Sequence, residues 1–392
     1  MKSNLQLYFL LALAVLLVFG VGYSQNEAGA WFVLEKKIFF FLIPLALATS
    51  AISTPALPKI LARLFCLTCF CALVVCYFYS WQQWRLFEDG KIGSAAVNYL
   101  SSSELWNVET AKPWLFFSYV SLSGGIGMHP TYLGMYCAFA CMIMIIEHRE
   151  ANTRLIKALM LVAILFFSIS IIFLAARIII VLLATVCVML LLYELFVEKA
   201  RIKTALTLPV LLVILLAGVL VNPVTRYRQV NEIIATGISV HPGTHYTNST
   251  SIRTSLWWLA SQAYFESNPF IGTGAGDVQQ SMQKASKQFG ITNVLATYDP
   301  HSQYLFLLLS SGAVGLGLFL GYVTIGFAKA WQSRDIRFLS FLLLVAAVWF
   351  TETALELQKG IVFFSVFFSS MSFVKAETSI VPSLPQLANA GR

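Results

Sequence analysis

The sequence predicts an all-α polytopic membrane protein with about ten transmembrane helices and a large helical loop between spans 7 and 8. Of its 392 residues, 58% are hydrophobic and only 11% are charged, whereas a soluble domain carries about 25% charged residues. Mean hydropathy is +0.76, and apolar runs of about 20 residues recur along the chain. A soluble protein of this composition would expose large apolar patches, so an ordinary cytosolic enzyme, a disordered chain and a fibrous protein are excluded.

The first apolar run has no small-residue cleavage site and is followed by further spans, so we expect a membrane helix there and not a signal peptide. The stretch from 158 to 195 is almost wholly apolar, which predicts two spans joined by a very tight turn near Arg177. The candidate spans are 5–22, 38–54, 60–79, 130–147, 158–175, 178–195, 205–221, 302–327, 338–350 and 360–374.

The placement of Lys and Arg predicts that both termini are cytoplasmic, because cytoplasmic loops are enriched in these residues. The net charge of +8 is then mainly an orientation signal, and no basic patch with interleaved aromatic residues indicates a nucleic-acid partner. Lys36 and Lys37 fall in a short outer turn and argue mildly against this orientation.

Three regions follow from this layout. Residues 1–221 hold spans 1–7 with an outer loop at 80–129, residues 222–301 form a second outer loop, and residues 302–392 hold spans 8–10 and a cytoplasmic tail. Loops longer than about 15 residues usually have structure or function of their own. The second outer loop contains an amphipathic helix over 252–266, because its apolar residues have helical spacing. Asn268-Pro269 ends that helix, and the glycine-rich turn IGTGAGD follows.

Two arginines are candidates for a functional site. Arg177 lies among apolar residues, so it either faces a cavity or reaches the outer headgroups from the tip of a hairpin. Arg253 lies in the first turn of the predicted loop helix, where a cation is unfavourable. Either an anion lies close to Arg253, or its charge is solvated on the polar face.

Two histidines precede predicted spans in a similar way. Asp299 fits an N-cap and Pro300 fits the first helical position, which places His301 at the second. A helix N-terminus disfavours imidazolium, so we expect His301 to be neutral and able to accept a proton. The same N-terminus offers N–H groups to an anion such as phosphate. His129 is either a second polar group over the same cavity or a structural turn residue.

The sequence predicts neither a metal nor another cofactor. The seven cysteines all lie in apolar runs, as buried thiols do, and the long polar loops contain none. His241 and His245 are close enough to share a metal, but no third ligand is evident near them.

Three segments occur in an order that resembles the O-antigen ligase and O-antigen polymerase superfamily. They are AARIIIVLLA with Arg177, SIRTSLWWLASQAYFESNPFIGTGAGDV with Arg253, and PHSQYLFLLLSSGAVGLGLF with His301. The resemblance is strongest over about 170–325, and the large outer loop separates the last two segments as in that family.

The resemblance implies a metal-independent, inverting glycosyl transfer at the periplasmic face of the bacterial inner membrane. The donor would be a glycan on undecaprenyl diphosphate, and the ligases use the lipid A–core as acceptor. Arg177 and Arg253 would bind the donor diphosphate, His301 would be the general base, and His129 and Tyr304 are possible secondary residues. Many ligases have Asn after the histidine, where this chain has Ser302, which puts the acceptor side in doubt.

Three alternatives remain open at the level of sequence. A chain polymerase would use a lipid-linked glycan as acceptor, and a protein O-oligosaccharyltransferase would use Ser or Thr of a periplasmic protein. A lipid-linked sugar transporter belongs to a different class. Charged residues lining several spans and two related halves would support the transporter, and we find neither in the sequence.

Overall fold

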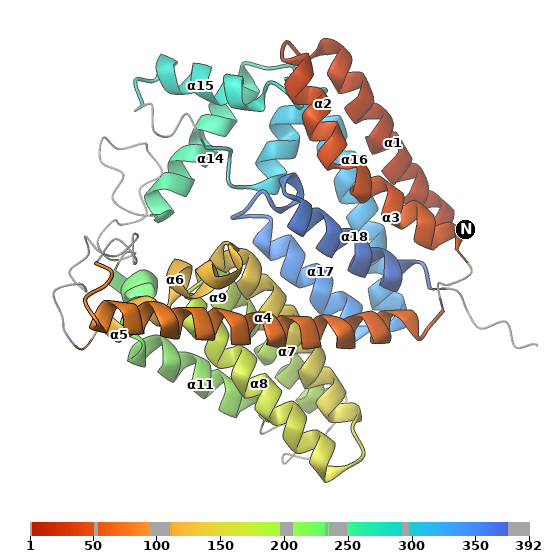
Figure 1. Cartoon of the computed structure of the whole chain (residues 1–392). Coiled ribbons are helices and arrows are strands. Elements are labelled where there is room, and N and C mark those ends of the chain that lie inside the picture. Colours follow the sequence, from red (N-terminus) through yellow and green to blue (C-terminus); the bar gives the residue numbers. More distant parts are fainter. Residues whose placement is uncertain are drawn as a thin grey trace, which may run out of the picture.

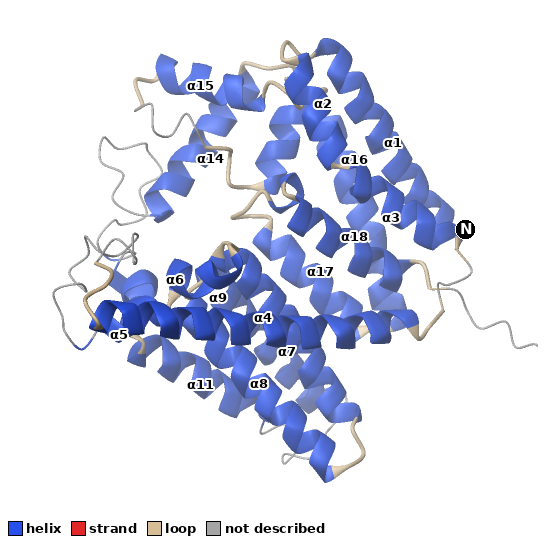
Figure 2. Ribbon diagram, viewed as in Figure 1, coloured by secondary structure: helices blue, strands red, loops and turns tan. Residues whose placement is uncertain are grey.

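The structure, a computed structural model, describes residues 2–50, 54–93, 110, 112–196, 207–231, 234, 249–291 and 298–374. These residues form helices and connecting turns without a β-strand among them (Figure 2), which confirms the all-α class. The principal helices are α1 (Lys2–Tyr23), α2 (Glu27–Lys36), α3 (Ile38–Thr49), α4 (Leu57–Glu88), α5 (Lys112–Phe117), α6 (Tyr119–Ser123), α7 (Pro130–Glu150), α8 (Arg154–Leu174), α9 (Arg177–Phe196), α11 (Thr207–Val221), α12 (Pro223–Arg226), α14 (Ser249–Phe265), α15 (Val278–Gln288), α16 (Gln303–Ser333), α17 (Ile336–Val348) and α18 (Gln358–Ser372).

A helix overlaps each of the predicted spans, but the count of about ten spans is not confirmed. In the described part of the chain, five helices are long and apolar enough to cross a membrane, namely α1, α4, α7, α8 and α16. A sixth results if the pair 209–221 and 223–230, bent by 87°, is one span. Helices α3, α17 and α18 have 12, 13 and 15 residues. At a rise of 1.5 Å per residue they are shorter than a hydrocarbon core of about 30 Å.

The helices form two groups with α17 between them (Figure 1). Helices α1, α3, α16 and α18 pack together on one side, and α4, α7, α8, α9 and α11 pack on the other. Helix α7 is the most enclosed span, and its small residues let neighbouring helices approach closely. All seven cysteines are free thiols, and six of them are buried while Cys71 is exposed.

The glycine-rich turn IGTGAGD fills a break in α16. At Gly312 the backbone leaves the helical conformation with a φ of 64°. The N–H groups of Thr273 and Gly274 donate to the carbonyl oxygens of Leu309 and Ser310, at 2.9 and 3.0 Å. Backbone groups freed by a broken membrane helix must be satisfied by other protein groups, and this turn supplies them. The turn therefore ties the loop segment to the span that follows His301.

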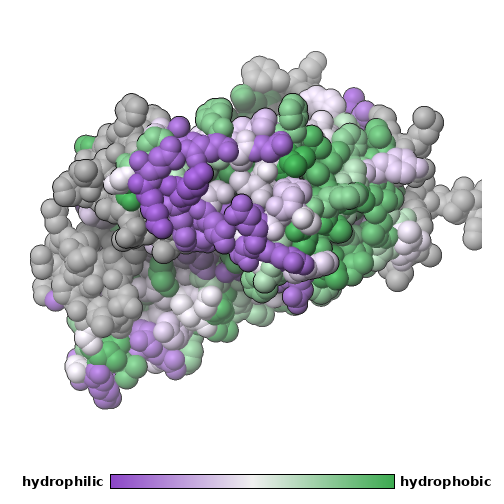
Figure 3. Space-filling model, turned by 90° about the horizontal axis from the view of Figure 1, so that it is seen from above, coloured by the Kyte–Doolittle hydropathy of each residue, from purple (hydrophilic) through white to green (hydrophobic). Residues whose placement is uncertain are grey.

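The predicted apolar face of the loop helix is part of a small separate core. Side chains of α14, α15 and the first turns of α16 pack together there, and the α14 members include Leu256, Leu259, Ala260 and Ala263. Seen from above, the molecule carries a band of hydrophilic residues beside a broad hydrophobic surface (Figure 3). The exposed side of α15 is polar, with Gln279, Gln280, Lys284 and Lys287.

A buried ion pair fixes the start of α16. Lys37, at the joint of α2 and α3, lies 2.6 Å from Glu356 Oε1, and both side chains are buried. Gln303 donates from Nε2 to the same oxygen at 3.0 Å, and its Oε1 accepts the N–H of Leu355 at 2.8 Å. These contacts hold the first residue of α16 against the segment between α17 and α18. They explain why Lys37 occurs in a turn that the orientation prediction places outside.

Candidate active site

His301 lies before α16 and not inside it, so the predicted helix start is wrong. Helix α16 begins at Gln303 with Ser302 as N-cap, and His301 has a left-handed backbone with a φ of 45°. Asp299 accepts the N–H of His301 through Oδ1 at 2.8 Å and the hydroxyl of Thr353 through Oδ2 at 2.6 Å. Asp299 therefore closes a local turn, which is an alternative open to Asp side chains, and the helix begins only at Gln303.

Two carboxylates set the environment of the His301 imidazole in place of the helix N-terminus. Its Nδ1 is buried and lies 3.7 Å from Glu352 Oε2 and 4.0 Å from Asp299 Oδ1. A carboxylate beside one ring nitrogen favours the tautomer with the proton on that nitrogen. This arrangement favours a proton on Nδ1 and a lone pair on Nε2. The side chain keeps 27% of its surface exposed, so a substrate hydroxyl can approach it.

Glu352 is also the anion that the position of Arg253 led us to expect. Arg253 donates from Nη2 to Glu352 Oε1 at 2.7 Å and from Nε to the carbonyl oxygen of Thr351 at 3.2 Å. Helix α14 starts at Ser249, three residues before the predicted start at 252, so Arg253 lies in its second turn. Burial alone would raise the pKa of Glu352, but the contact with His301 and the charge of Arg253 outweigh burial and lower it. Glu352 is therefore ionised at neutral pH.

Arg177 reaches the same place through the beginning of α14. It is the first residue of α9, directly after a tight turn in which Ala175 has a φ of 48°. Its Nη1 donates to the hydroxyl of Thr250, and Thr250 lies one turn before Arg253 on α14. Residues i and i+3 share a helix face, so the contact of Arg177 lies one helical turn from that of Arg253. The three predicted residues thus form a network in which Glu352 contacts Arg253 and His301, and Arg177 contacts α14 one turn before Arg253.

His129 forms the N-cap of α7, as its reading as a turn residue predicts. Its Nδ1 accepts the N–H of Thr131 at 3.4 Å. Burial lowers the pKa of His129, the charges of Arg253, Lys359 and Arg228 lower it further, and the charge of Glu352 opposes them. His129 therefore lies in the same electrostatic environment as the network.

Sequence reasoning missed Arg228 and gave no role to Glu352. Arg228 lies in a π-helical turn over Tyr227–Asn231, a geometry that is frequent at functional sites. Its side chain is buried, its Nε donates to the carbonyl of Ala175 at 3.3 Å, and its guanidinium carbon lies 3.5 Å from the ring centroid of Tyr119. The segment RYRQ follows a predicted span, but its pattern does not indicate which arginine turns inward. Glu352 could have been identified as a candidate because carboxylates are rare at the ends of the predicted spans.

Tyr304 is turned toward α17. Its hydroxyl donates to the carbonyl oxygen of Ala346 at 2.9 Å, and its ring lies 4.8 Å from that of Phe350. This hydroxyl serves helix packing in the structure.

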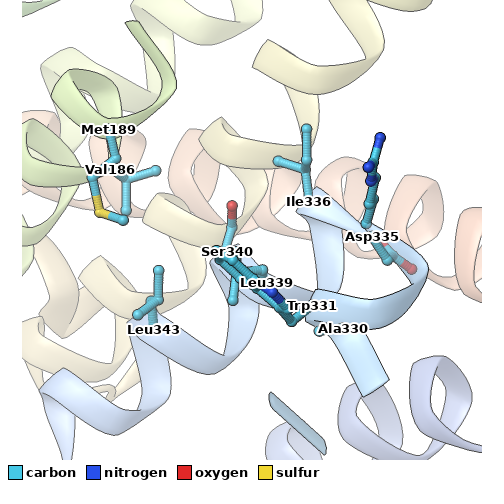
Figure 4. Close-up of a pocket in the computed structure, with 10 residues that line it drawn as sticks. Val186, Met189, Ala330, Trp331, Asp335, Ile336, Leu339, Ser340 and Leu343 are labelled. Carbon is cyan, nitrogen blue, oxygen red and sulfur yellow. The ribbon is translucent and has the colours of Figure 1, made fainter. Parts of the chain in front are cut away.

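A cavity at the other end of α16 is not part of this network. It has a volume of about 510 Å³ and lies between α9 and the α16–α17 turn (Figure 4). Among the described residues, no group of three His, Cys, Asp or Glu side chains is placed to hold a metal. His241 and His245 lie outside the described residues, so the prediction of a metal-free site stays a prediction.

Comparison with known protein families identifies the segment that carries this network. Residues 160–320 match the family described as O-antigen ligase. The match includes Arg177, Arg253 and His301, whereas Glu352 lies beyond it. It confirms the resemblance to the O-antigen ligase and polymerase superfamily. A search of curated proteins finds no match to the chain.

Proposed function

We propose that this protein, whose residues 160–320 carry the O-antigen ligase family segment, transfers a glycan from undecaprenyl diphosphate to a hydroxyl of the lipid A–core. The proposed reaction is metal-independent, inverts the anomeric carbon and takes place at the periplasmic face of the inner membrane. The observation that carries the proposal is the contact of Glu352 with both Arg253 and His301, together with the hydrogen bond of Arg177 to Thr250 one helical turn before Arg253. A histidine whose Nδ1 lies beside a buried carboxylate can accept a proton at Nε2.

In the proposed reaction His301 acts as general base through Nε2. The acceptor hydroxyl gives its proton to Nε2 while its oxygen attacks the anomeric carbon of the donor glycan. The bond from that carbon to the phosphate oxygen breaks on the opposite face, and the electron pair leaves with the diphosphate. Glu352 Oε2, 3.7 Å from Nδ1, stabilises the imidazolium that forms.

The two arginines take up the negative charge that grows on the leaving diphosphate. Guanidinium groups bind phosphate oxygens through paired N–H donors, and placed donors stabilise developing charge without a metal. Arg253 uses Nη2 and Nε in its contacts with Glu352 and Thr351, and it has further N–H groups on Nη1. In this proposal Arg253 contacts both the leaving diphosphate and Glu352, the carboxylate beside His301.

The proposal is tested by replacing Arg177, Arg253 and His301 separately with alanine. We expect each variant to fold and to lose glycan transfer in membranes that contain donor and acceptor. His148→Ala and Arg154→Ala are matched controls, because both residues lie away from the network, His148 near the end of α7 and Arg154 at the start of α8. Normal transfer by all three folded site variants would refute the site.

The acceptor is tested separately with a deletion strain. If the lipid A–core is the acceptor, a lipopolysaccharide gel of that strain shows core without attached glycan. Core that carries a single repeat unit would instead identify a chain polymerase. Activity that is lost on adding a chelator and restored by a divalent cation would contradict the metal-free mechanism.

A further inference from the structure

His129 has a ring nitrogen that is already engaged by the backbone. Its Nδ1 accepts the N–H of Thr131 at 3.4 Å, and an accepting nitrogen carries no proton. In neutral imidazole the other nitrogen then holds the proton. His129 is thus an Nε2–H donor, whereas the carboxylates beside Nδ1 of His301 favour the opposite tautomer.

Two tyrosines hold the His129 ring between them. The ring centroids of Tyr119 and Tyr132 lie 6.3 and 6.5 Å from that of His129, at interplanar angles of 80° and 82°. Both tyrosines are buried, while the imidazole of His129 keeps part of its surface exposed. Such edge-to-face packing fixes the plane of the ring, so the exposed imidazole has a defined direction.

Each of these tyrosines carries a cation on its face. The guanidinium carbon of Arg228 lies 3.5 Å from the ring centroid of Tyr119, and Nζ of Lys359 lies 4.7 Å from that of Tyr132. Burial lowers the pKa of His129, and the charges of Arg253, Lys359 and Arg228 lower it further. Glu352 is the charge that opposes them. Arg228 and Lys359 can attract an anionic oxygen, and the imidazole can add a directed hydrogen bond to it.

We propose that His129 is a substrate-binding residue whose Nε2–H donates a hydrogen bond to a phosphate oxygen of the lipid-linked donor. This inference rests on the proposed function and extends its diphosphate site to a third side, formed by α6, α7 and the π-helical turn. The two histidines then differ in tautomer and in role. His129 gives a hydrogen bond from Nε2–H to the phosphate of the lipid-linked glycan, and His301 accepts the proton of the acceptor hydroxyl at Nε2.

Two substitutions separate this role from capping. Asparagine places its side-chain oxygen near the position of Nδ1 and is a favoured N-cap, so His129→Asn keeps the cap and removes the distal donor. Glutamine reaches the position of Nε2 with an N–H group, so His129→Gln keeps the donor and removes the cap. His148→Asn, near the other end of the same helix, is the matched control.

The experiment measures the affinity of the purified full chain for undecaprenyl diphosphate, together with its thermal stability. We expect His129→Asn to unfold like the wild type and to bind at least tenfold more weakly, because a hydrogen bond to a charged group is lost. His129→Gln should be less stable but bind within about threefold of the wild type.

Wild-type affinity in His129→Asn would overturn the proposal, and so would a loss confined to the KM for the acceptor. If His129→Gln binds as weakly as His129→Asn although it is folded, the donor role is refuted as well. The proposed function fails separately, and His129 with it, if the wild type does not bind undecaprenyl diphosphate. If the wild type binds undecaprenyl diphosphate and His129→Asn binds it equally well, the role of His129 is wrong and the proposed function stands.

Discussion

The carboxylate of Glu352 contacts two of the three residues that the sequence indicates as functional. Oε1 accepts from Arg253 at 2.7 Å, and Oε2 lies 3.7 Å from His301 Nδ1. In the proposed reaction Glu352 is a positioning residue, because it holds the base and one of the phosphate-binding arginines. Its side chain is only 7% exposed, so water screens its charge weakly.

Glu352→Gln should lower kcat of glycan transfer by about 10²- to 10⁴-fold, because the carboxylate beside a general-base histidine stabilises its imidazolium. The amide keeps the shape but cannot stabilise the imidazolium of His301. The measurement is the rate of transfer at saturating acceptor over a range of pH. Glu27→Gln replaces an exposed carboxylate and serves as control. An unchanged kcat and pH profile in Glu352→Gln would show that His301 acts without it.

The lowered pKa of Glu352 also predicts how stability depends on pH. A carboxylate whose pKa in the folded state lies below the ordinary value of 4.5 stabilises the fold above that value. This contribution is lost as the pH falls through the folded pKa. The difference in Tm between the wild type and Glu352→Gln should therefore be largest near neutral pH and shrink below about pH 4.5. A difference that grows on acidification would contradict the sign of the shift.

The sequence could indicate Arg177, Arg253 and His301 because they stand out in apolar or patterned surroundings. It could not place His301, because Asp299 satisfies the signals of an N-cap and those of a local turn equally well. The left-handed backbone at His301 is a tertiary outcome that no spacing rule contains. Glu352 and Arg228 were not predicted as site residues, since their roles come from contacts between segments far apart in the chain.

At the level of elements, the break in α16 and the glycine-rich turn form one unit. A Cβ atom on Gly312 would lie 2.3 Å from the backbone of Phe270, and one on Gly272 would lie 2.5 Å from the carbonyl oxygen of Leu309. Neither neighbour is the end of a flexible side chain. Both positions also have a positive φ, which disfavours other residues.

Gly312→Ala should therefore destabilise the protein by about 2 kcal/mol or more, from backbone strain and displacement of the turn. Gly317→Ala is the matched control in the same helix, where a Cβ meets no atom within 4 Å. That change should be neutral or stabilise by up to about 1 kcal/mol. Denaturant unfolding in detergent micelles measures both. Equal effects of the two substitutions would contradict the described fit of the turn into the break.

The apolar runs predict well that helices form, but they predict the lengths of these helices poorly. Each predicted span overlaps a helix, because a long apolar run favours one whatever its neighbours. Several of these helices are shorter than a bilayer requires, and one helix bends by 87° at Asn222-Pro223. Helix ends depend on caps and turns such as Asn222 and Asp335, whose side chains accept N–H groups of the following turn. These caps decide the boundaries and are weak signals in an apolar sequence.

For the whole molecule, the ion pair between Lys37 and Glu356 joins the N-terminal helices to the C-terminal ones. Both charges are buried, and Gln303 at the start of α16 shares the carboxylate. Removal of one partner from a buried pair leaves an uncompensated charge, which is far more costly than removal of both.

Lys37→Met should destabilise the protein by about 3–5 kcal/mol, and a second substitution Glu356→Leu should restore a large part of that loss. Lys36→Met is the control, because Lys36 lies over the ring of Phe32 at 4.6 Å and gains about 1 kcal/mol or less from it. The measurement is thermal unfolding of the purified protein. A double variant that is less stable than Lys37→Met would contradict a simple paired charge.

In the proposed reaction His301 accepts the proton of a hydroxyl during glycan transfer from a lipid diphosphate. The most direct test compares the wild type with His301→Ala. Purified wild type and His301→Ala are supplied with undecaprenyl diphosphate-linked glycan and lipid A–core, with a chelator present, and the rate and anomeric configuration of the product are determined. We predict an inverted product from the wild type and a rate about 10²- to 10⁴-fold lower for His301→Ala, with donor affinity retained. A folded His301→Ala variant that transfers the glycan at the wild-type rate would contradict the claim.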